Sequence, residues 1–265
     1  MSMRFTLLGT GSSAGVPRVG PVWGNCDPAN PRNRRRRCAL LVERRRGSGR
    51  TTVLVDTPPD LRDQLLEASV GALDGVLYTH DHADHTHGID DLRGVFFNTK
   101  RRVRVWADAA TRKTLETRFE YCFRQKPGSS YPAILQAHDI VAPEPVRIDG
   151  AGGLVEAVPV PHEHGEMASL GFRFGNVLYS PDICGIPESA LPLVQGLELW
   201  IVDALRPVTH HTHFSVQQAL DWIERLGVKR GILTHMTVEL DYETLRRRLP
   251  PNVEPGYDGM VVEVD

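Results

Sequence analysis

Short runs of apolar and β-branched residues recur along the chain and alternate with longer stretches whose apolar positions repeat at helical spacing. Runs of about 4–8 such residues are typical of buried strands, whereas a period near 3.6 residues indicates amphipathic helices. The runs predict strands at Arg4–Leu8, Ala39–Arg44, Thr51–Asp56, Gly75–Tyr78, Val103–Ala107, Leu154–Val160, Leu170–Phe174, Val177–Ser180, Leu199–Asp203, Gly231–Thr234 and Met260–Val264.

The helical pattern predicts helices at Asp60–Ala68, Ile89–Phe96, Ala109–Phe123, Ser215–Leu226 and Tyr242–Arg248. Strand and helix signals alternate in both halves of the chain, which indicates the α/β class. They resume at once on both sides of every loop, so we expect one domain over residues 1–265.

Three loop segments need an interpretation of their own. The basic stretches Arg32–Arg37 and Arg44–Arg50 are expected to be loops; we favour a solvated face for the arginines of the first, although they could hold a phosphate. The residues GTGSSA at 9–14 match a dinucleotide-binding fingerprint, but the chain continues as a loop instead of a helix. These glycines are therefore expected to serve a tight turn or a close backbone approach.

Composition narrows the function classes. Of 265 residues, 41% are hydrophobic and 24% are charged, as in soluble globular proteins, and the net charge of -2 argues against a general polyanion binder. No apolar run approaches the ~20 residues of a membrane span, and the first residues do not resemble a signal peptide. Four scattered cysteines lack CxxC spacing. We therefore expect a cytoplasmic protein without membrane contact.

Histidine is concentrated in one short segment after a predicted strand. Residues 79–88 read THDHADHTHG. Imidazole and carboxylate are the usual ligands of Zn²⁺ and Mn²⁺, and a short loop can direct His80 and His82 at one ion and Asp84 and His85 at a second. A solvated polar loop is the alternative, but such loops favour Asn, Ser and Lys over histidine.

Further polar side chains stand at the carboxyl ends of predicted strands; they are Asp56, His164, Asp182, Asp203 and His235. Those ends form the edge where α/β sheets place their sites, so we expect these side chains to converge with the histidine segment. Asp182, with two carboxylate oxygens, is the natural bridge between two cations. Taken singly, each also fits a cap or a buried structural group, and His162 competes with His164.

The segment THHTHFS at 209–215 precedes a predicted helix and offers three more imidazoles. A histidine of this segment that is not a metal ligand can protonate a leaving group. We expect Arg206 and His211 to be available for substrate binding. The alternative for His210 and His211 is an exposed capping loop.

At these residues the sequence resembles the metallo-β-lactamase superfamily, whose H-x-H-x-D-H signature matches residues 80–85. The resemblance implies a four-layer αβ/βα sandwich and a dinuclear site. It assigns His80, His82 and His164 to the first metal. Asp84, His85 and His235 would bind the second, with Asp182 bridging. Asp56 matches a carboxylate that lies behind the ligands in this superfamily.

Within the superfamily the chain is most similar to phosphodiesterases of the carbon-phosphorus lyase pathway, which open phosphoribosyl 1,2-cyclic phosphate. The matching segments are residues 8–11, 15–17, 79–88, 180–182, 213, 233–235 and 257–260. The resemblance implies hydrolysis of a small cyclic phosphodiester, such as a phosphoribosyl cyclic phosphate or a cyclic nucleotide. It also implies two divalent ions, Zn²⁺ or Mn²⁺ with Fe²⁺ also suited, catalytic roles for His213 and Asp182, and a homodimer.

Alternatives differ in specific features. The tRNA 3′-processing endonucleases share the opening glycines, but Asp108–Gly150 is too short for their tRNA-binding arm and the net charge is not typical of a tRNA binder. A thioester hydrolase is a further alternative, and a non-catalytic metal-binding module would be expected to lack ligands. The related phosphodiesterases carry closely spaced zinc-binding cysteines, whereas here only Cys26 and the distant Cys38 remain, so a structural zinc stays open.

Overall fold

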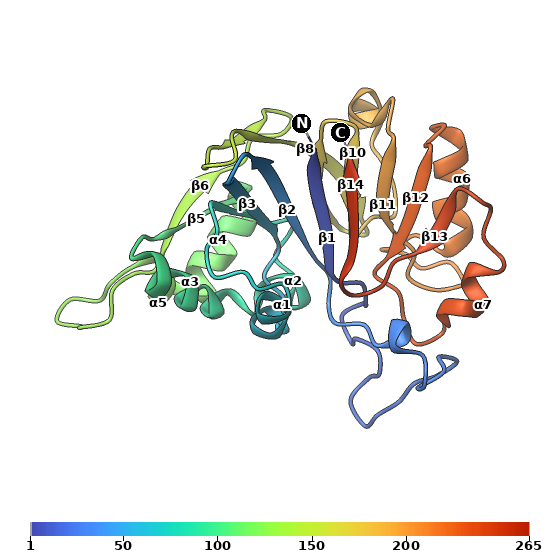
Figure 1. Cartoon of the computed structure of the whole chain (residues 1–265), viewed down its shortest axis with the longest axis horizontal. Coiled ribbons are helices and arrows are strands. Elements are labelled where there is room, and N and C mark those ends of the chain that lie inside the picture. Colours follow the sequence, from blue (N-terminus) through green and yellow to red (C-terminus); the bar gives the residue numbers. More distant parts are fainter. Residues whose placement is uncertain (1, 265) are drawn as a thin grey trace.

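The computed structural model describes residues 2–264 and contains two seven-stranded sheets packed face to face between two layers of helices (Figure 1). The first sheet has the order β14-β1-β2-β3-β4-β5-β6. Its strands are β1 (Met3–Gly9), β2 (Ala39–Arg46), β3 (Gly49–Val55), β4 (Gly75–Leu77), β5 (Val103–Ala107), β6 (Leu135–Asp139) and β14 (Met260–Val264). This arrangement confirms the four-layer αβ/βα sandwich.

The second sheet has the order β13-β12-β11-β10-β9-β8-β7. Its strands are β7 (Val146–Ile148), β8 (Val155–His164), β9 (Met167–Phe174), β10 (Val177–Ser180), β11 (Leu199–Asp203), β12 (Arg230–Thr234) and β13 (Val253–Pro255). Strands β3 to β6 are parallel to one another, as are β10 to β13. Parallel strands end at the same edge of a sheet, so each sheet delivers several loops to one place.

Helices cover the outer face of each sheet (Figure 1). The first sheet carries α1 (Leu61–Glu67), α2 (Ala83–Thr86), α3 (Leu92–Thr99), α4 (Ala109–Arg118) and α5 (Glu120–Phe123); the second carries α6 (Val216–Arg225) and α7 (Tyr242–Arg246). Short 3-10 helices are η1 (Pro31–Asn33), η2 (Ile89–Asp91) and η3 (Glu188–Val194). Among residues 2–264, no helix combines the length and the apolar character that a membrane crossing requires.

Helix α6 begins where the sequence predicts. The side chain of Ser215 accepts a hydrogen bond from the backbone N–H of Gln218, and the Gln218 side chain bonds back to the Ser215 N–H. This capping box satisfies donors that the first turn of a helix otherwise leaves free. Gly227, with a φ of 61°, follows the helix end in the left-handed conformation that glycine adopts without strain.

Three large hydrophobic clusters form most of the core of the described residues. Between the sheets, Phe5 and Val42 of the first sheet pack with Phe172, Phe174 and Ile201 of the second. A second cluster joins the first sheet to its helices, and a third joins the second sheet to α6, α7 and η3. The middle layer packs the two sheets against each other, so loops from both can meet at one edge.

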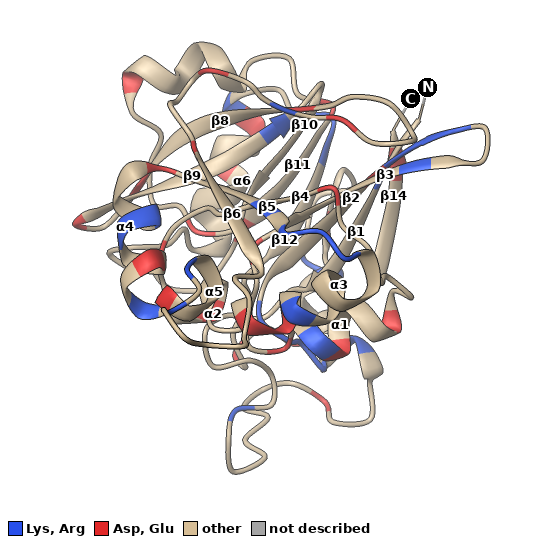
Figure 2. Ribbon diagram, turned by 90° about the vertical axis from the view of Figure 1, so that its left-hand side faces the viewer, with Lys and Arg blue, Asp and Glu red and all other residues tan. Residues whose placement is uncertain are grey.

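Some predicted elements are wrong in detail. Phe119, with φ −123° and ψ 37°, interrupts the helix expected over Ala109–Phe123 and divides it into α4 and α5. The basic stretch Arg44–Arg50 is not a loop but the end of the β2–β3 hairpin, whose turn is only two residues long (Figure 2). Carboxylate oxygens of Glu43 lie 3.5 Å from the guanidinium of Arg45 and 3.1 Å from that of Arg50. The negative charge of Glu43 therefore offsets the repulsion between the two arginines.

The solvated face expected for the arginines of Arg32–Arg37 holds for Arg34, which is exposed, but is wrong for Arg35 and Arg36. The side chain of Arg35 is only 2% exposed. Arg36 pairs with Asp258 at 3.1 Å and with a second carboxylate, that of Glu67, at 2.6 Å. Nη1 of the buried Arg35 instead donates to the carbonyl oxygen of Thr237 at 3.4 Å. Long-range partners of either kind leave no local signal in the sequence.

The glycines before this segment behave as expected. A Cβ atom added at Gly9 would collide with the backbone carbonyl oxygen of Arg37. The chain therefore uses Gly9 for a close approach between backbones and not for binding a dinucleotide.

Phe172 provides a test of the middle layer. It is fully buried between the sheets, so Phe172→Ala should lower the free energy of unfolding by about 3–5 kcal/mol. Phe97, 54% exposed on α3, is the matched control, and Phe97→Ala should change it by less than about 0.5 kcal/mol. Denaturant unfolding of both variants measures the difference, and equal losses would contradict this packing.

Candidate metal centre

The histidine segment enters the site from the end of β4. His80 lies in the loop that follows β4, and His82, whose backbone is extended, is the N-terminal cap residue of α2. Asp84 and His85 then lie on the single turn of α2 and are buried. The change from extended chain to helix directs the two pairs of side chains differently, as the spacing of the sequence suggests.

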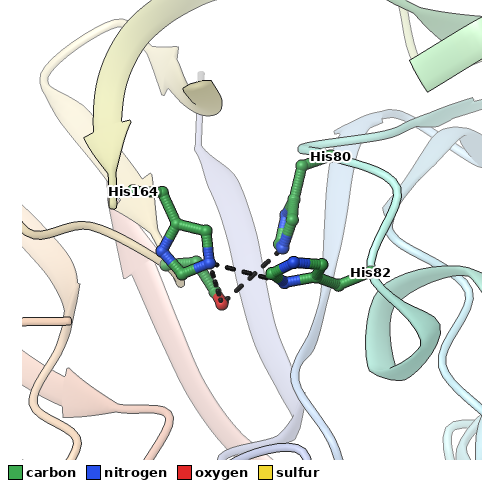
Figure 3. A group of neighbouring side chains, drawn as sticks. His80, His82 and His164 are labelled. Carbon is green, nitrogen blue, oxygen red and sulfur yellow. Dashed lines mark hydrogen bonds and ion pairs between the residues drawn. The ribbon is translucent and has the colours of Figure 1, made fainter. Parts of the chain in front are cut away.

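Three imidazoles and one carboxylate form the first cluster. Figure 3 shows His80, His82 and His164 pointing toward one another. Nε2 of His164 lies 3.4 Å from Nδ1 of His82 and 3.6 Å from Oδ2 of Asp182. Nε2 of His80 lies 3.7 Å from the same carboxylate oxygen. These four side chains could hold one metal ion.

Asp84, His85 and His235 form the second cluster. Oδ2 of Asp84 lies 3.5 Å from Nε2 of His85 and 3.4 Å from Nε2 of His235. The other oxygen of Asp182, Oδ1, lies 3.0 Å from Nε2 of His85 and 3.5 Å from Nε2 of His235. Asp182 therefore turns one oxygen toward each cluster.

Hydrogen bonds behind the clusters fix the histidine rings. Nδ1 of His164 lies 2.7 Å from the carbonyl oxygen of Thr212, so Nδ1 carries the proton and Nε2 keeps its lone pair. Nδ1 of His85 bonds to Oδ2 of Asp56 at 2.7 Å. Asp56 is itself held by the backbone N–H and hydroxyl of Thr79. Asp56 thus lies where the sequence places it, behind a candidate ligand.

Backbone strain marks the same edge. Asp56, at the end of β3, has a φ of 66°, and His235, after β12, has a φ of 56°. Residues other than glycine adopt this left-handed region at a cost of about 1–3 kcal/mol, and such residues concentrate at functional sites. The strained backbone directs the side chain of Asp56 at His85 and the side chain of His235 at the second cluster.

The buried atoms of the clusters fit a divalent cation. Nε2 of His80, Nε2 of His85 and Oδ1 of Asp182 are buried and make no hydrogen bond within the described chain. Lone pairs that converge without a donor are costly, and a metal ion satisfies several of them at once. Imidazole and carboxylate ligands suit Zn²⁺, Mn²⁺ or Fe²⁺.

The charges around the clusters also favour a cation. Burial alone would lower the pKa of His85, but Asp182, Asp84 and Asp56 together raise it well above its usual value. Burial lowers the pKa of His80 well below its usual value, which keeps this imidazole neutral and able to donate a lone pair. The site thus combines carboxylates that attract positive charge with a neutral imidazole that can bind a metal ion.

His213 lies beside the clusters and has a partner that the sequence did not assign. Its Nδ1 lies 2.7 Å from Oδ2 of Asp203, and its Nε2 lies 3.9 Å from Oδ2 of Asp182. Asp203 is fully buried at the end of β11. Its position at a strand end was a signal for the site, but only the three-dimensional contact relates it to His213.

The other candidate residues lie outside the clusters. His162 is buried and bonds through Nε2 to the hydroxyl of Ser180 at 2.8 Å, so His164, and not His162, lies beside the other candidate ligands. Arg206 is half-buried and donates to carbonyl oxygens of its own loop, and His211 is exposed. Neither of the last two touches the clusters within the described residues.

Cys26 and Cys38 occupy separate surroundings. Nη1 of Arg35 lies 3.7 Å from Sγ of Cys26, and a guanidinium at that distance opposes a bound cation. Sγ of Cys38 lies 3.4 Å from the hydroxyl of Thr234. Neither cysteine belongs to a group of potential metal ligands among residues 2–264.

Comparison with known proteins identifies the family. The Beta-lactamase superfamily domain matches residues 51–236. This chain belongs to the metallo-β-lactamase superfamily. The fold and the segment HDHADH agree with that assignment, which the sequence predicted.

Individual relatives refine the picture. A solved structure of a diphosphatase from the PhnP family is 32% identical, with a TM-score of 0.87 over 100% of this chain and 98% of that chain. The Zn²⁺-bound PqqB of Methylobacterium extorquens is 16% identical, with a TM-score of 0.66 over 98% of this chain and 99% of that chain, and shows likeness of fold alone. Superfamily membership and the first of these relatives indicate a metal-dependent hydrolase.

A curated relative, the octanoyltransferase of Porphyromonas gingivalis, is 32% identical over 266 residues. The match covers 99% of this chain and 52% of that protein. This chain therefore spans about half the length of the curated relative that it matches.

Metal content tests the clusters. Because Asp182 faces both of them, Asp182→Ala should reduce the number of divalent ions per chain, as measured by mass spectrometry of protein purified and dialysed in parallel with the wild type. Glu163, an exposed carboxylate beside His164, is the control, and Glu163→Ala should leave the metal content unchanged. Equal metal content in all three proteins would contradict the assignment.

Proposed function

We propose that this protein hydrolyses a small phosphodiester of the cyclic ribose phosphate or cyclic nucleotide type with two divalent ions. The observation that carries the proposal is the division of the Asp182 carboxylate between two ligand clusters, with the Nε2 atom of His213 directed at the same carboxylate. A pair of cations is well suited to the two anionic oxygens of a phosphodiester, and a histidine beside them can supply a proton.

The residues of each cluster have distinct tasks. One ion would be held by His80, His82 and His164 and the other by Asp84, His85 and His235, with Asp182 between them. Divalent ions bound in such a site polarise phosphoryl oxygens and make water a nucleophile at neutral pH. The chain itself contributes rigid positions, because Asp56, Thr79 and Thr212 hold the rings from behind.

His213 is the proposed general acid. Nδ1 bonds to the buried carboxylate of Asp203, which orients the ring and stabilises its protonated form, so that Nε2 can give a proton to the departing oxygen. Burial lowers the pKa of His213, while Asp182 and Asp84 act in the opposite direction. Asp203 is thus a positioning residue.

The relatives support cleavage of a phosphorus–oxygen bond. The diphosphatase that shares 32% of its residues with this chain covers the chain completely. A diphosphate and a phosphodiester both place a bridging oxygen between phosphorus and a leaving group. This similarity favours phosphate esters over lactams as the substrate.

Acyl thioester hydrolysis is a second candidate, because of the octanoyltransferase relative. An octanoyl group is an acyl group, and a metal-dependent hydrolase could cleave a thioester that carries one. However, this chain matches only 52% of that protein, so the named activity need not belong to the matching part. The phosphodiester proposal therefore has the stronger support.

Phosphorus NMR tests the two candidates. We expect protein loaded with Zn²⁺ or Mn²⁺ to convert ribose 1,2-cyclic phosphate into a phosphomonoester, and the Asp182→Ala variant to do so at a rate reduced by at least about 10²-fold. An octanoyl thioester is assayed in parallel with a thiol reagent. Turnover of the thioester alone would replace the phosphodiester proposal with the second candidate.

The acid role of His213 makes a separate prediction. His213→Ala should lower kcat by about 10²–10⁴-fold on an ester with an alkoxide leaving group. It should lower kcat far less on bis(4-nitrophenyl) phosphate, whose leaving group departs without a proton. A similar loss on both esters would contradict the acid role. Asp203→Asn should show the same dependence on the leaving group, with smaller losses.

A further inference from the structure

A row of buried polar side chains crosses four strands of the second sheet next to the metal centre. Strands β8, β9, β10 and β11 are neighbours in that sheet. His162 lies on β8, Ser180 ends β10 and Trp200 lies on β11, and each is at most 2% exposed. Nε2 of His162 lies 2.8 Å from the hydroxyl oxygen of Ser180, and the indole N–H of Trp200 donates to the same oxygen at 3.0 Å. The Ser180 hydroxyl therefore joins β8 to β10 and β11.

A glycine leaves room for this row on the strand in between. Gly171 lies on β9, which separates the strands that carry His162 and Ser180. A Cβ atom added at Gly171 would come within 2.2 Å of Nε2 of His162. A side chain at this position would displace the imidazole, so the hydrogen bond across β9 depends on glycine.

The partners determine where the protons of the row lie. The carbonyl oxygen of Pro161, 3.0 Å from Nδ1 of His162, can only accept, so Nδ1 carries a proton. Burial lowers the pKa of His162 to about 4, so at pH 7 the ring is neutral with a lone pair on Nε2. The Ser180 hydroxyl accepts from Trp200 and donates its own proton to that lone pair. Each N–H and O–H of the row then has an acceptor.

The row lies equally far along two strands from two candidate ligands. His164 follows His162 by two residues on β8, and Asp182 follows Ser180 by two residues at the end of β10. Nε2 of His164 lies 3.6 Å from Oδ2 of Asp182. Ser169 adds a second tie, because its hydroxyl donates to the carbonyl oxygen of Asp182 at 2.6 Å.

We infer that His162 and Ser180 are positioning residues for the first metal ion, because their hydrogen bond sets the separation of His164 and Asp182. The inference rests on the dinuclear centre of the proposed function, which it deepens by giving a task to a buried histidine that lies outside both clusters. Metal ligands must meet their ion to within about 0.2 Å, so a small shift between β8 and β10 lowers the affinity for the ion.

Calorimetric titration of metal-free protein with Zn²⁺ measures this effect without turnover. We expect the wild type to bind two ions per chain. His162→Leu should raise the Kd of one of them about tenfold and leave the other within about twofold of wild type. Ser180→Ala removes the same hydrogen bond with a smaller change of volume and should act on the same binding step.

Two further variants separate positioning from a general loss of packing. His162→Gln should restore most of the lost affinity, because its Oε1 atom can accept the Ser180 proton as Nε2 does. Val177→Ala removes buried volume at the start of β10 and should leave both Kd values within about twofold of wild type. An equal loss of affinity in Val177→Ala would overturn the positioning role.

A double-mutant cycle shows whether His162 acts through His164. His164→Ala removes a candidate ligand and should weaken the same binding step more strongly than His162→Leu does. Adding His162→Leu to His164→Ala should then change the Kd by less than about twofold, because the ligand to be positioned is gone. A further tenfold rise in the double variant would overturn the inference.

The outcomes distinguish this inference from the proposed function. Two ions bound by the wild type, with unchanged Kd values in His162→Leu and Ser180→Ala, would overturn the positioning role alone. Weaker binding in these variants, together with a wild type that cuts no cyclic phosphate ester, would overturn the phosphodiesterase proposal alone. Fewer than two ions in the wild type would overturn both.

Discussion

The burial of Asp182 is the constraint on which the rest of the site depends. This carboxylate is 2% exposed, and each of its oxygens faces imidazoles of a different cluster. A buried carboxylate is stable only where positive charge or donors surround it. The imidazoles come from the ends of strands in both sheets, so the packing of the two sheets brings the candidate ligands together. Neutral imidazoles do not balance the negative charge of the buried carboxylates, and this charge favours divalent cations.

A second set of residues makes this arrangement rigid. Thr79 and Thr212 form hydrogen bonds with the ring nitrogens of His80 and His164 that face away from the clusters, and the backbone N–H of Thr79 also holds Asp56. The opposite ring nitrogens are left directed at the clusters. Asp203 does the same for His213, whose free nitrogen then faces Asp182. The left-handed backbone at Asp56 and His235 lies in the same region. Hydrogen bonds and local backbone strain thus fix the directions of the candidate ligand side chains. The core between the sheets holds in place the strands from which these side chains extend.

Much of this could be predicted from the sequence, because strand ends and histidine spacing are local signals. Central strands such as β10 and β11 were predicted with correct ends, since they are short apolar runs. The strands β6, β7 and β13 have no strand signal in the sequence because they lie at the edges of their sheets. β6 contains several polar residues, and β7 and β13 are only three residues long. The burial of Arg35 and the partnership of Asp203 with His213 depend on tertiary contacts and have no local pattern.

The central claim is that Asp182 stands between two cations, and a crystal structure of the Mn²⁺- or Zn²⁺-loaded protein with anomalous diffraction tests it most directly. The account predicts two anomalous peaks, one beside His80, His82 and His164 and the other beside Asp84, His85 and His235, with one oxygen of Asp182 at each. A single peak, or two peaks neither of which contacts Asp182, would contradict it.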